Sequence, residues 1–228
     1  MAEGDTESAK PKRGAARVAI IGYGREAREQ ALRLQAAGWD VDVVVRAGGM
    51  SWVSAVGDGF RPGSSSAAVA RADVIAVHVP EAEQPAAWAY GIAPFLVPGA
   101  LVVFVHGSAL YSGAVDPAPG VDVVLVAGGA RGPRVAVHRD SSGHAHERAL
   151  AFARAGHGQE QVGTTTLDAE VGADLFELGA KMGGLAGLLA EWDRVLASPS
   201  HEPDEAALTY YERLRATVLA DGRKRGAA

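Results

Sequence analysis

Short, continuous apolar runs recur along the first two thirds of the chain and alternate with Ala-rich stretches of helical spacing. The runs are rich in Val and Ile and are bounded by Pro and Gly, which is typical of strands buried on both faces. Strands that alternate with helices predict a doubly wound parallel α/β sheet, a Rossmann-like fold. The predicted strands occupy residues 17–22, 40–46, 72–80, 100–107, 121–129, 134–140 and 161–166.

Helical periodicity predicts helices between these strands, over residues 25–38, from the serines at 64–66 to 72, and over 144–155. After Thr166 the pattern changes to one long apolar helix, followed by a Pro-rich turn and a second helix. We therefore divide the chain into a disordered leader (1–15), a Rossmann dinucleotide-binding domain (16–166) and a small all-α domain (167–228). Two helices cannot enclose an apolar face by themselves, which predicts a homodimer through the helical domain.

Composition excludes several classes of partner. The net charge of -5 gives no basic field for nucleic acid, and the absence of cysteine excludes disulfides and thiolate metal sites. The polar start of the chain lacks the apolar core of a secretory signal, and the longest apolar runs are too short to cross a bilayer. We expect a cytoplasmic protein that acts on a small molecule, away from membranes and nucleic acid.

The sharpest motif is GYGREA at residues 22–27, directly after the first predicted strand and at the start of a helix. In this G-x-G-x-x-A fingerprint Gly22 permits a tight turn, Gly24 lets a pyrophosphate approach the backbone, and Ala27 keeps helix and strand close. Tyr23 and Arg25 belong to the same loop, and we expect them at the cofactor. The alternative is that the glycines only form the turn; the carboxylate of the next residue, Glu26, opposes an anion there, which Arg25 can offset.

The end of the second predicted strand indicates which cofactor binds. Enzymes that use NAD usually carry an Asp or Glu there for the ribose hydroxyls. This chain has Arg46 at the strand end and Ser51 five residues later, whereas Asp42 lies earlier, inside the strand. A guanidinium and a hydroxyl suit a 2′-phosphate, so the pattern favours NADP(H). A solvated Arg46 without a ligand is the alternative.

Several motifs in order carry a family resemblance: VAIIGYG, RAGGMSW, ADVIAVHVPEAEQP, IAPFLVPGALVVFVHG and TTTLDAEVGADLFELGAKMGGLAGLL. Over residues 17–220 the chain resembles the ketol-acid reductoisomerases. The resemblance implies a Rossmann domain that binds NADPH and a helical domain whose carboxylates hold two magnesium ions. In that family these groups drive an alkyl migration coupled to reduction of a ketone.

Carried over residue by residue, the resemblance places Gly22, Gly24, Arg46 and Ser51 at the cofactor. We also expect Val79 and Pro80, at the end of the third predicted strand, and His106 to contact the cofactor. The resemblance also implies an active-site role for His106, in VFVHG, where the strand ends and ligands bind in such sheets. His78, near the end of the preceding predicted strand, is expected near the nicotinamide. Its role is left open, either as a site residue or as a structural one.

The carboxylates of the helical region match the family only in part. Asp174 matches a carboxylate that bridges the two metal ions, and Glu212 matches a carboxylate from the second helix pair. The glutamate expected four residues after Asp174 is replaced by Leu178, and Glu177 stands one position earlier, as after a deletion of one residue. The position four residues after Glu212 is Ala216.

Two further departures accompany these. A lysine expected after the fifth predicted strand is replaced by Gly128 and Gly129, and the family continues beyond the length of this chain. Magnesium needs several well-placed oxygens, so we expect no Mg²⁺ and no dimetal centre. Asp174, Glu177 and Glu212 are then candidate catalytic carboxylates without a metal, with solvated helix carboxylates as the alternative.

Three functions remain open from the sequence. The first is NADPH-dependent reduction of a small carbonyl or imine in a biosynthetic pathway, with His106 as proton donor or orienting group. The second is a redox-neutral isomerisation, cyclisation or elimination in the same cleft. The third is a non-catalytic binding subunit.

Overall fold

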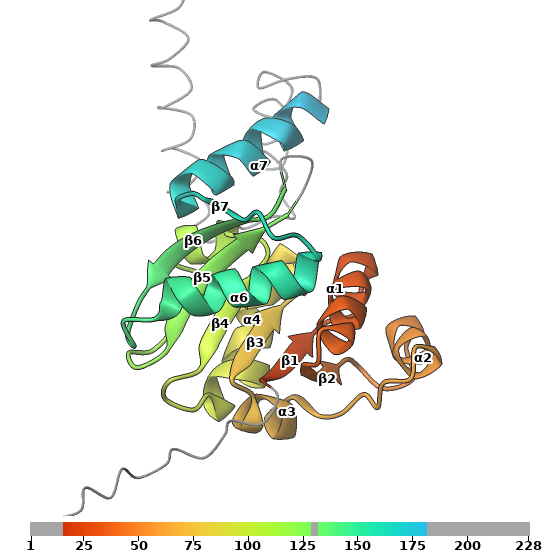
Figure 1. Cartoon of the computed structure of the whole chain (residues 1–228). Helices are drawn as coiled ribbons and strands as arrows, with labels where there is room; N and C mark the ends of the chain where they lie inside the picture. Colours follow the sequence, from red (N-terminus) through yellow and green to blue (C-terminus); the bar gives the residue numbers. More distant parts are fainter. Residues whose placement is uncertain (1–15, 129–131, 182–228) are drawn as a thin grey trace, which may run out of the picture.

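The structure is a computed structural model that describes residues 16–128 and 132–181. Its strands form one sheet in the order β2-β1-β3-β4-β5-β6-β7 (Figure 1). From β2 to β5 all neighbours run parallel. The strands are β1 (Arg17–Ile21), β2 (Asp40–Val44), β3 (Val74–Val77), β4 (Leu101–Phe104), β5 (Asp122–Ala127), β6 (Arg134–Arg139) and β7 (Gly163–Thr164).

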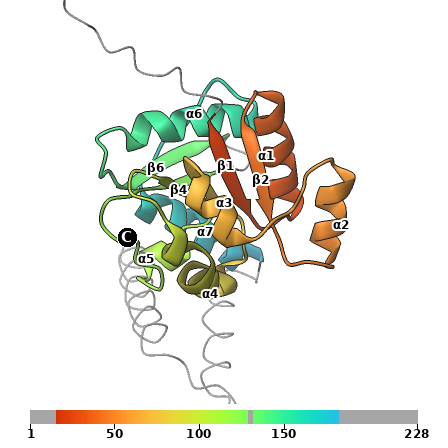
Figure 2. The ribbon, with the colours of Figure 1, turned by 90° about the horizontal axis from the view of Figure 1, so that it is seen from below.

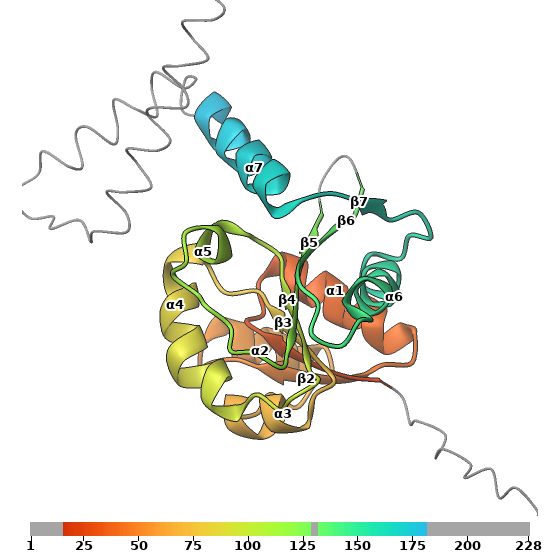
Figure 3. The ribbon, with the colours of Figure 1, turned by 90° about the vertical axis from the view of Figure 1, so that its left-hand side faces the viewer.

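Helices cover both faces of this sheet. In the views along and across the strands, α1 and α6 lie over one face, and α3, α4 and α5 lie over the other (Figures 2 and 3). Helix α7 lies beyond the end of the sheet (Figure 3). The helices are α1 (Arg25–Ala36), α2 (Met50–Gly57), α3 (Ser65–Arg71), α4 (Gln84–Ala86), α5 (Ser108–Tyr111), α6 (Ala145–His157) and α7 (Leu167–Lys181), with short turns at η1 (Glu81–Glu83), η2 (Ala87–Ile92) and η3 (Ala93–Phe95).

The apolar core forms two layers, one on each face of the sheet. Every residue of β3, β4 and β5 is buried, because successive side chains point to opposite faces and both faces are covered. One cluster joins the sheet to α1 and α6, with Leu34 and Phe152 at its centre. The other joins it to α3, η2 and α5, around Phe104 and Ile92. The predicted doubly wound, Rossmann-like fold is thereby confirmed.

One strand departs from the predicted parallel sheet. Strand β6 runs antiparallel to β5, and β7 then runs parallel to β6. The reason is the short connection, residues 128–133, since a parallel return needs a crossover of a dozen residues or more. Helix α6 then brings the chain back to the edge of the sheet where β5 ends.

Some local structure differs from the sequence-based predictions. Helix α2 was not predicted, nor was the irregular helical segment from η1 to η3, which contains Pro85 and Pro94. Ser64 does occupy the N-cap of α3, but its side chain makes no capping hydrogen bond. The proposed leader, the end of the long apolar helix and the predicted dimer contact lie outside the described residues. Within the described ranges, no helix is both long and apolar enough to span a membrane.

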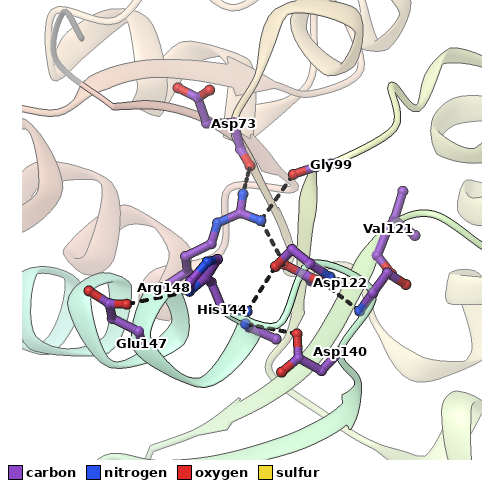
Figure 4. Close-up of polar contacts among 11 residues, drawn as sticks. Asp73, Gly99, Val121, Asp122, Asp140, His144, Glu147 and Arg148 are labelled. Carbon is purple, nitrogen blue, oxygen red and sulfur yellow. Dashed lines mark hydrogen bonds and ion pairs between the residues drawn. The ribbon is translucent and has the colours of Figure 1, made fainter. Parts of the chain in front are cut away.

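A polar network holds together the starts of three central strands (Figure 4). Arg148 on α6 donates to the carbonyl oxygens of Gly99 and Asp73 at 3.0 and 2.9 Å, and to the carboxylate of Asp122 at 2.7 Å. Asp122 is fully buried and also accepts hydrogen bonds from Ser141 and Ser142. These contacts stabilise the amino-terminal edge of β3, β4 and β5 and leave the opposite edge for a ligand.

Candidate functional site

A cleft of about 800 Å³ lies at the carboxyl ends of β3, β4 and β5. Its other walls are one side of α1, the last turn of α6 and the first turns of α7. The chain leaves β1 toward β2 on one side and later returns to β3 on the other, so β1 and β3 form a topological switch point. Ligands of open α/β sheets bind at such a point, and the cleft volume lies in the range of small-molecule sites.

The GYG turn brings the ends of β1 and β3 into contact. Gly22 has a φ of +95°, and a Cβ atom there would stand 3.0 Å from the carbonyl oxygen of His78 and 3.3 Å from the amide of Val79. Only glycine fits this turn. Gly24 is the N-cap of α1, and a Cβ atom on it would meet nothing within 4 Å. The space beside Gly24 is therefore open, and free N–H groups at a helix start form an anion site.

Tyr23 directs its side chain away from this open space and into the core. The ring is 5% exposed and packs edge-on against Phe60, and the hydroxyl donates to Asp58 at 2.9 Å. Burial, together with the hydrogen bond to Asp58, raises the pKa of Tyr23 far above its ordinary value. In this arrangement Tyr23 could contact a cofactor only through its backbone, and its predicted place at the cofactor stays a prediction.

Asp58 connects the two helices that flank the proposed nucleotide site. It caps the end of α2 and accepts two hydrogen bonds of 2.6 Å from Arg28 on α1, besides the one from Tyr23. Nothing in the sequence singled out this residue. Because α2 follows the loop that carries Arg46, this contact fixes that loop against the helix that begins at Gly24.

Arg46 and Ser51 lie together on the segment that leaves β2. Arg46 is exposed two residues after the strand, and no hydrogen bond or ion pair joins it to another described residue. Ser51 is half-buried in the first turn of α2. Asp42 is bound instead by Arg71 on α3, in a bidentate ion pair. The cation and hydroxyl predicted for a 2′-phosphate are thus available, and the carboxylate inside the strand is not.

The remaining predicted cofactor residues are near the cleft. Arg25 is exposed in the first turn of α1 and lines the cleft, beside Glu26. Pro80 is exposed and lines it too, whereas Val79 is half-buried and packs against the core.

His106 follows β4, is exposed and lines the cleft. The next residue, Gly107, is the contact point of α7: a Cβ atom there would stand 2.6 Å from Leu167 Cδ1 and 3.0 Å from Val171 Cγ2. Helix α7 therefore packs directly on the backbone next to His106. Asp174, farther along α7, is exposed and lines the same cleft.

The other carboxylates do not form a metal site within the described residues. Glu170, one turn before Asp174, is buried and bound by Arg134 and Thr165. In the described ranges no group of three or more His, Asp or Glu side chains could hold a metal ion. The side chain of Glu177 and the whole of Glu212 lie outside the described residues, so their predicted roles stay predictions.

Two buried polar contacts at the cleft were missed by sequence reasoning. Gln30, on the cleft side of α1, meets His78 Nε2 through its Oε1 at 2.7 Å. Arg134 and Glu170 form the second contact. The only signal for Gln30 was its helical spacing with Ala27, Ala31 and Leu34, which are all buried.

His157, at the end of α6, also lines the cleft, and burial lowers the pKa of its imidazole.

Comparisons with known proteins agree with this geometry. Residues 14–163 match the family described as acetohydroxy acid isomeroreductase, NADPH-binding domain. The chain is 40% identical over 219 residues to a ketol-acid reductoisomerase (NADP(+)) of Pyrobaculum islandicum, covering 89% of this chain and 65% of that protein. For the protein of the same name from Pyrobaculum arsenaticum the values are 39% over 219 residues, 89% and 66%.

The chain thus spans slightly less than two thirds of the length of these two relatives. Among solved structures, an NADH-preferring ketol-acid reductoisomerase from an uncultured archaeon aligns with a TM-score of 0.68 and 29% identity, over 92% of this chain and 71% of that one. The Gly22–Gly24 turn, the His106 strand end and the match over residues 14–163 lead to one conclusion: this chain belongs to the ketol-acid reductoisomerase family.

Proposed function

We propose that this chain binds NADP(H) and uses it to reduce a small carbonyl or imine compound. The observation that carries the proposal is the open backbone at Gly24, which starts α1 beside a cleft of about 800 Å³. A dinucleotide needs such an approach for its pyrophosphate. The proposal is further supported by the names of the relatives, which are NADP(+) enzymes.

The residues at the switch point fit the cofactor. The backbone of the turn and the first N–H groups of α1 would hold the pyrophosphate, and Arg25 would offset the nearby charge of Glu26. Arg46 and Ser51 would hold the 2′-phosphate, since the guanidinium has no ion-pair partner among the described residues. When bound, reduced nicotinamide supplies the hydride that a carbonyl or imine carbon accepts.

His106 supplies the proton in this proposal. The carbonyl oxygen or imine nitrogen gains the proton as its carbon gains the hydride, so C=O becomes CH–OH and C=N becomes CH–NH. An imidazole at the strand end is suited to this general-acid role, and its exposure lets solvent reprotonate it. Asp174 faces the same cleft from α7 and would orient a hydroxyl or ammonium group of the substrate.

The proposed reaction includes no metal-dependent step. A pair of magnesium ions needs several oxygen ligands. Among the described residues of α7, Asp174 lines the cleft, and the carboxylate of Glu170 is bound by Arg134 and Thr165. Leu178 replaces one glutamate expected from the resemblance, and Ala216 stands where a further carboxylate is expected. An alkyl migration that depends on two Lewis-acid ions is therefore outside the proposal.

Isothermal calorimetry with NADPH, NADH and Mg²⁺, each added separately, tests the proposal. We expect NADPH to bind more tightly than NADH and Mg²⁺ alone to give no heat of binding. Arg46→Ala should weaken NADPH about tenfold and NADH little, as loss of one charge-assisted hydrogen-bond partner predicts. Arg17→Ala is the control, because it removes a half-buried arginine that pairs with Asp40 at the start of β1, away from the cleft. Failure of NADPH to bind at millimolar concentration would overturn the proposal.

A redox-neutral reaction in the same cleft is the second candidate. It is supported by Glu26, an exposed carboxylate in the first turn of α1, where the phosphate of a cofactor would bind. Turnover that continues unchanged without nicotinamide would favour this candidate, and absolute dependence on NADPH would exclude it.

A further inference from the structure

A contact between α1 and β3 fixes a histidine on the wall of the cleft. His78 follows β3, is half-buried and lines the cleft. Its Nε2 atom lies 2.7 Å from Oε1 of Gln30, a residue of α1 that is 4% exposed. The distance is that of a short hydrogen bond, so the imidazole ring is held by a buried partner from another element.

A glycine on α6 keeps Gln30 in this position. A Cβ atom at Gly156 would stand 2.9 Å from Gln30 Cγ, 3.1 Å from Nε2 and 3.2 Å from Cδ. Any larger residue at 156 would displace the carboxamide. Three elements therefore determine the position of the imidazole: it follows directly on β3, α1 supplies its partner, and Gly156 of α6 leaves room for that partner.

The carboxamide oxygen determines where the imidazole carries its proton. Oε1 of Gln30 is an acceptor only, so Nε2 of His78 is the donor. A neutral imidazole has one N–H, which leaves a lone pair on Nδ1. Nδ1 has no hydrogen-bond partner among the described residues. Burial, with repulsion from His106 and His157, lowers the pKa of His78 to about 3, so the ring is neutral at physiological pH. The other charged groups that line the cleft are Arg25, Glu26, Glu29, Arg33, Glu81, Glu170 and Asp174.

We infer that His78 is a fixed, neutral hydrogen-bond acceptor, positioned by Gln30, whose Nδ1 atom binds a hydroxyl or amide N–H of the nicotinamide nucleotide. The inference rests on the proposed function for its ligand, and on the Gln30 contact for its tautomer. It assigns opposite roles to two histidines at neighbouring strand ends: His106 donates a proton, and His78 accepts a hydrogen bond and holds no proton for transfer. Gln30 is a positioning residue that acts through His78.

The tautomer can be measured without any ligand. Long-range ¹H–¹⁵N correlation spectra of histidine-labelled protein at neutral pH distinguish an Nε2–H ring from an Nδ1–H ring. We expect His78 to be the Nε2–H tautomer. Gln30→Leu, which removes the acceptor at similar size, should convert the signal to a mixture of tautomers. Gln35→Leu, at an exposed position of the same helix, should leave it unchanged. An Nδ1–H ring in the unsubstituted protein overturns the inference.

The ligand contact is tested by NADPH titration of His78 variants. Asparagine places an amide oxygen near the position of Nδ1, so His78→Asn should bind NADPH within about threefold of the unsubstituted protein. His78→Phe removes the acceptor and should weaken binding about tenfold, a change of ~1.4 kcal/mol. Thermal melting of each variant separates weak binding from misfolding. Equal binding by His78→Phe and the unsubstituted protein overturns the acceptor role.

Failure of the proposed function and failure of the acceptor role of His78 give different results in these experiments. If the unsubstituted protein binds no NADPH, both the proposed function and the acceptor role are overturned, while the Nε2–H signal, which needs no ligand, still reports whether Gln30 fixes the ring. If NADPH binds and His78→Phe is unaffected, only the acceptor role is overturned.

Discussion

The guanidinium of Arg134 on β6 donates two hydrogen bonds to the carboxylate of Glu170 on α7, Nε to Oε1 at 2.7 Å and Nη2 to Oε2 at 2.6 Å. The two side chains are 15% and 4% exposed, and the hydroxyl of Thr165 donates to the same carboxylate at 2.9 Å. Asp174 lies one turn farther along α7. The ion pair therefore sets the position from which Asp174 faces the cleft.

Breaking this pair from one side should be costly. Arg134→Met leaves Glu170 buried without its cation, and we expect a loss of about 3 kcal/mol in the free energy of unfolding, measured by urea denaturation. The double variant Arg134→Met with Glu170→Leu should recover most of that loss, because it removes both charges. A single variant as stable as the unsubstituted protein would show that the pair does not hold α7 in solution.

Substitutions at the two glycines of the turn should affect stability and NADPH binding differently. Gly24→Ala introduces a methyl group into open space at an ordinary φ of −77°, so we expect unfolding to be unchanged within about 0.5 kcal/mol. NADPH affinity should fall at least about tenfold, because the methyl group occupies the approach of the pyrophosphate. Calorimetry and thermal melting on the same sample give both quantities.

Gly22→Ala, unlike Gly24→Ala, should lower the free energy of unfolding. It combines a φ of +95° with a Cβ atom 3.0 Å from the backbone of His78, and we expect a loss of about 1–3 kcal/mol. If Gly24→Ala proves the more destabilising of the two, the turn in solution differs from the one described.

Tyr23→Phe tests the contact between α1 and α2. It removes one hydrogen bond to Asp58, and we expect a loss of ~1 kcal/mol in urea denaturation. Because α2 carries Ser51 and follows Arg46, the ratio of NADPH to NADH affinity should also decrease. Tyr111→Phe, on α5, is the matched control for the loss of a phenolic hydroxyl and should leave that ratio unchanged.

The lowered pKa of Asp122 predicts how the stability of the protein depends on pH. Burial raises its pKa, but hydrogen bonds from Ser142, Arg148 and Ser141 lower it more, so the net pKa is below the ordinary 3.8. A lowered carboxyl pKa contributes stability above the ordinary pKa, and this contribution is lost as the pH falls through the pKa of the folded state. Melting temperatures between pH 7 and pH 2 should therefore fall less steeply for Asp122→Asn than for the unsubstituted protein. Parallel curves for the two proteins would contradict this assignment.

The fold was predictable because its signals are local. Apolar runs such as VAIIG and LVVF mark strands buried on both faces, and Gly22 and Gly24 mark the turn between a strand and a helix. Arg46 and His106 were predicted as site residues for a similar reason, since each lies at the end of a predicted strand, and His106 does line the cleft. Position at the carboxyl end of a strand placed His106 at the cleft.

The contacts that complete the site depend on pairing between distant segments. Gln30 and His78 are 48 residues apart, and their contact also needs the bare backbone of Gly156. Glu170 and Asp174 are both carboxylates on α7 that line the cleft, and their spacing in the sequence does not show that Glu170 forms a buried ion pair with Arg134 on β6. The antiparallel direction of β6, by contrast, follows from the short connection between residues 127 and 134, which is too short for a parallel crossover.

The late position of α6 and α7 in the chain has a consequence for the biosynthesis of the protein. The Gly22–Gly24 turn and the first five strands lie within the first 127 residues, whereas Gly156 and Glu170 are synthesised later, with α6 and α7. Contacts between segments so far apart in sequence close late. On the ribosome the nucleotide-binding half would emerge first, and the pocket would mature only after α6 and α7 had docked.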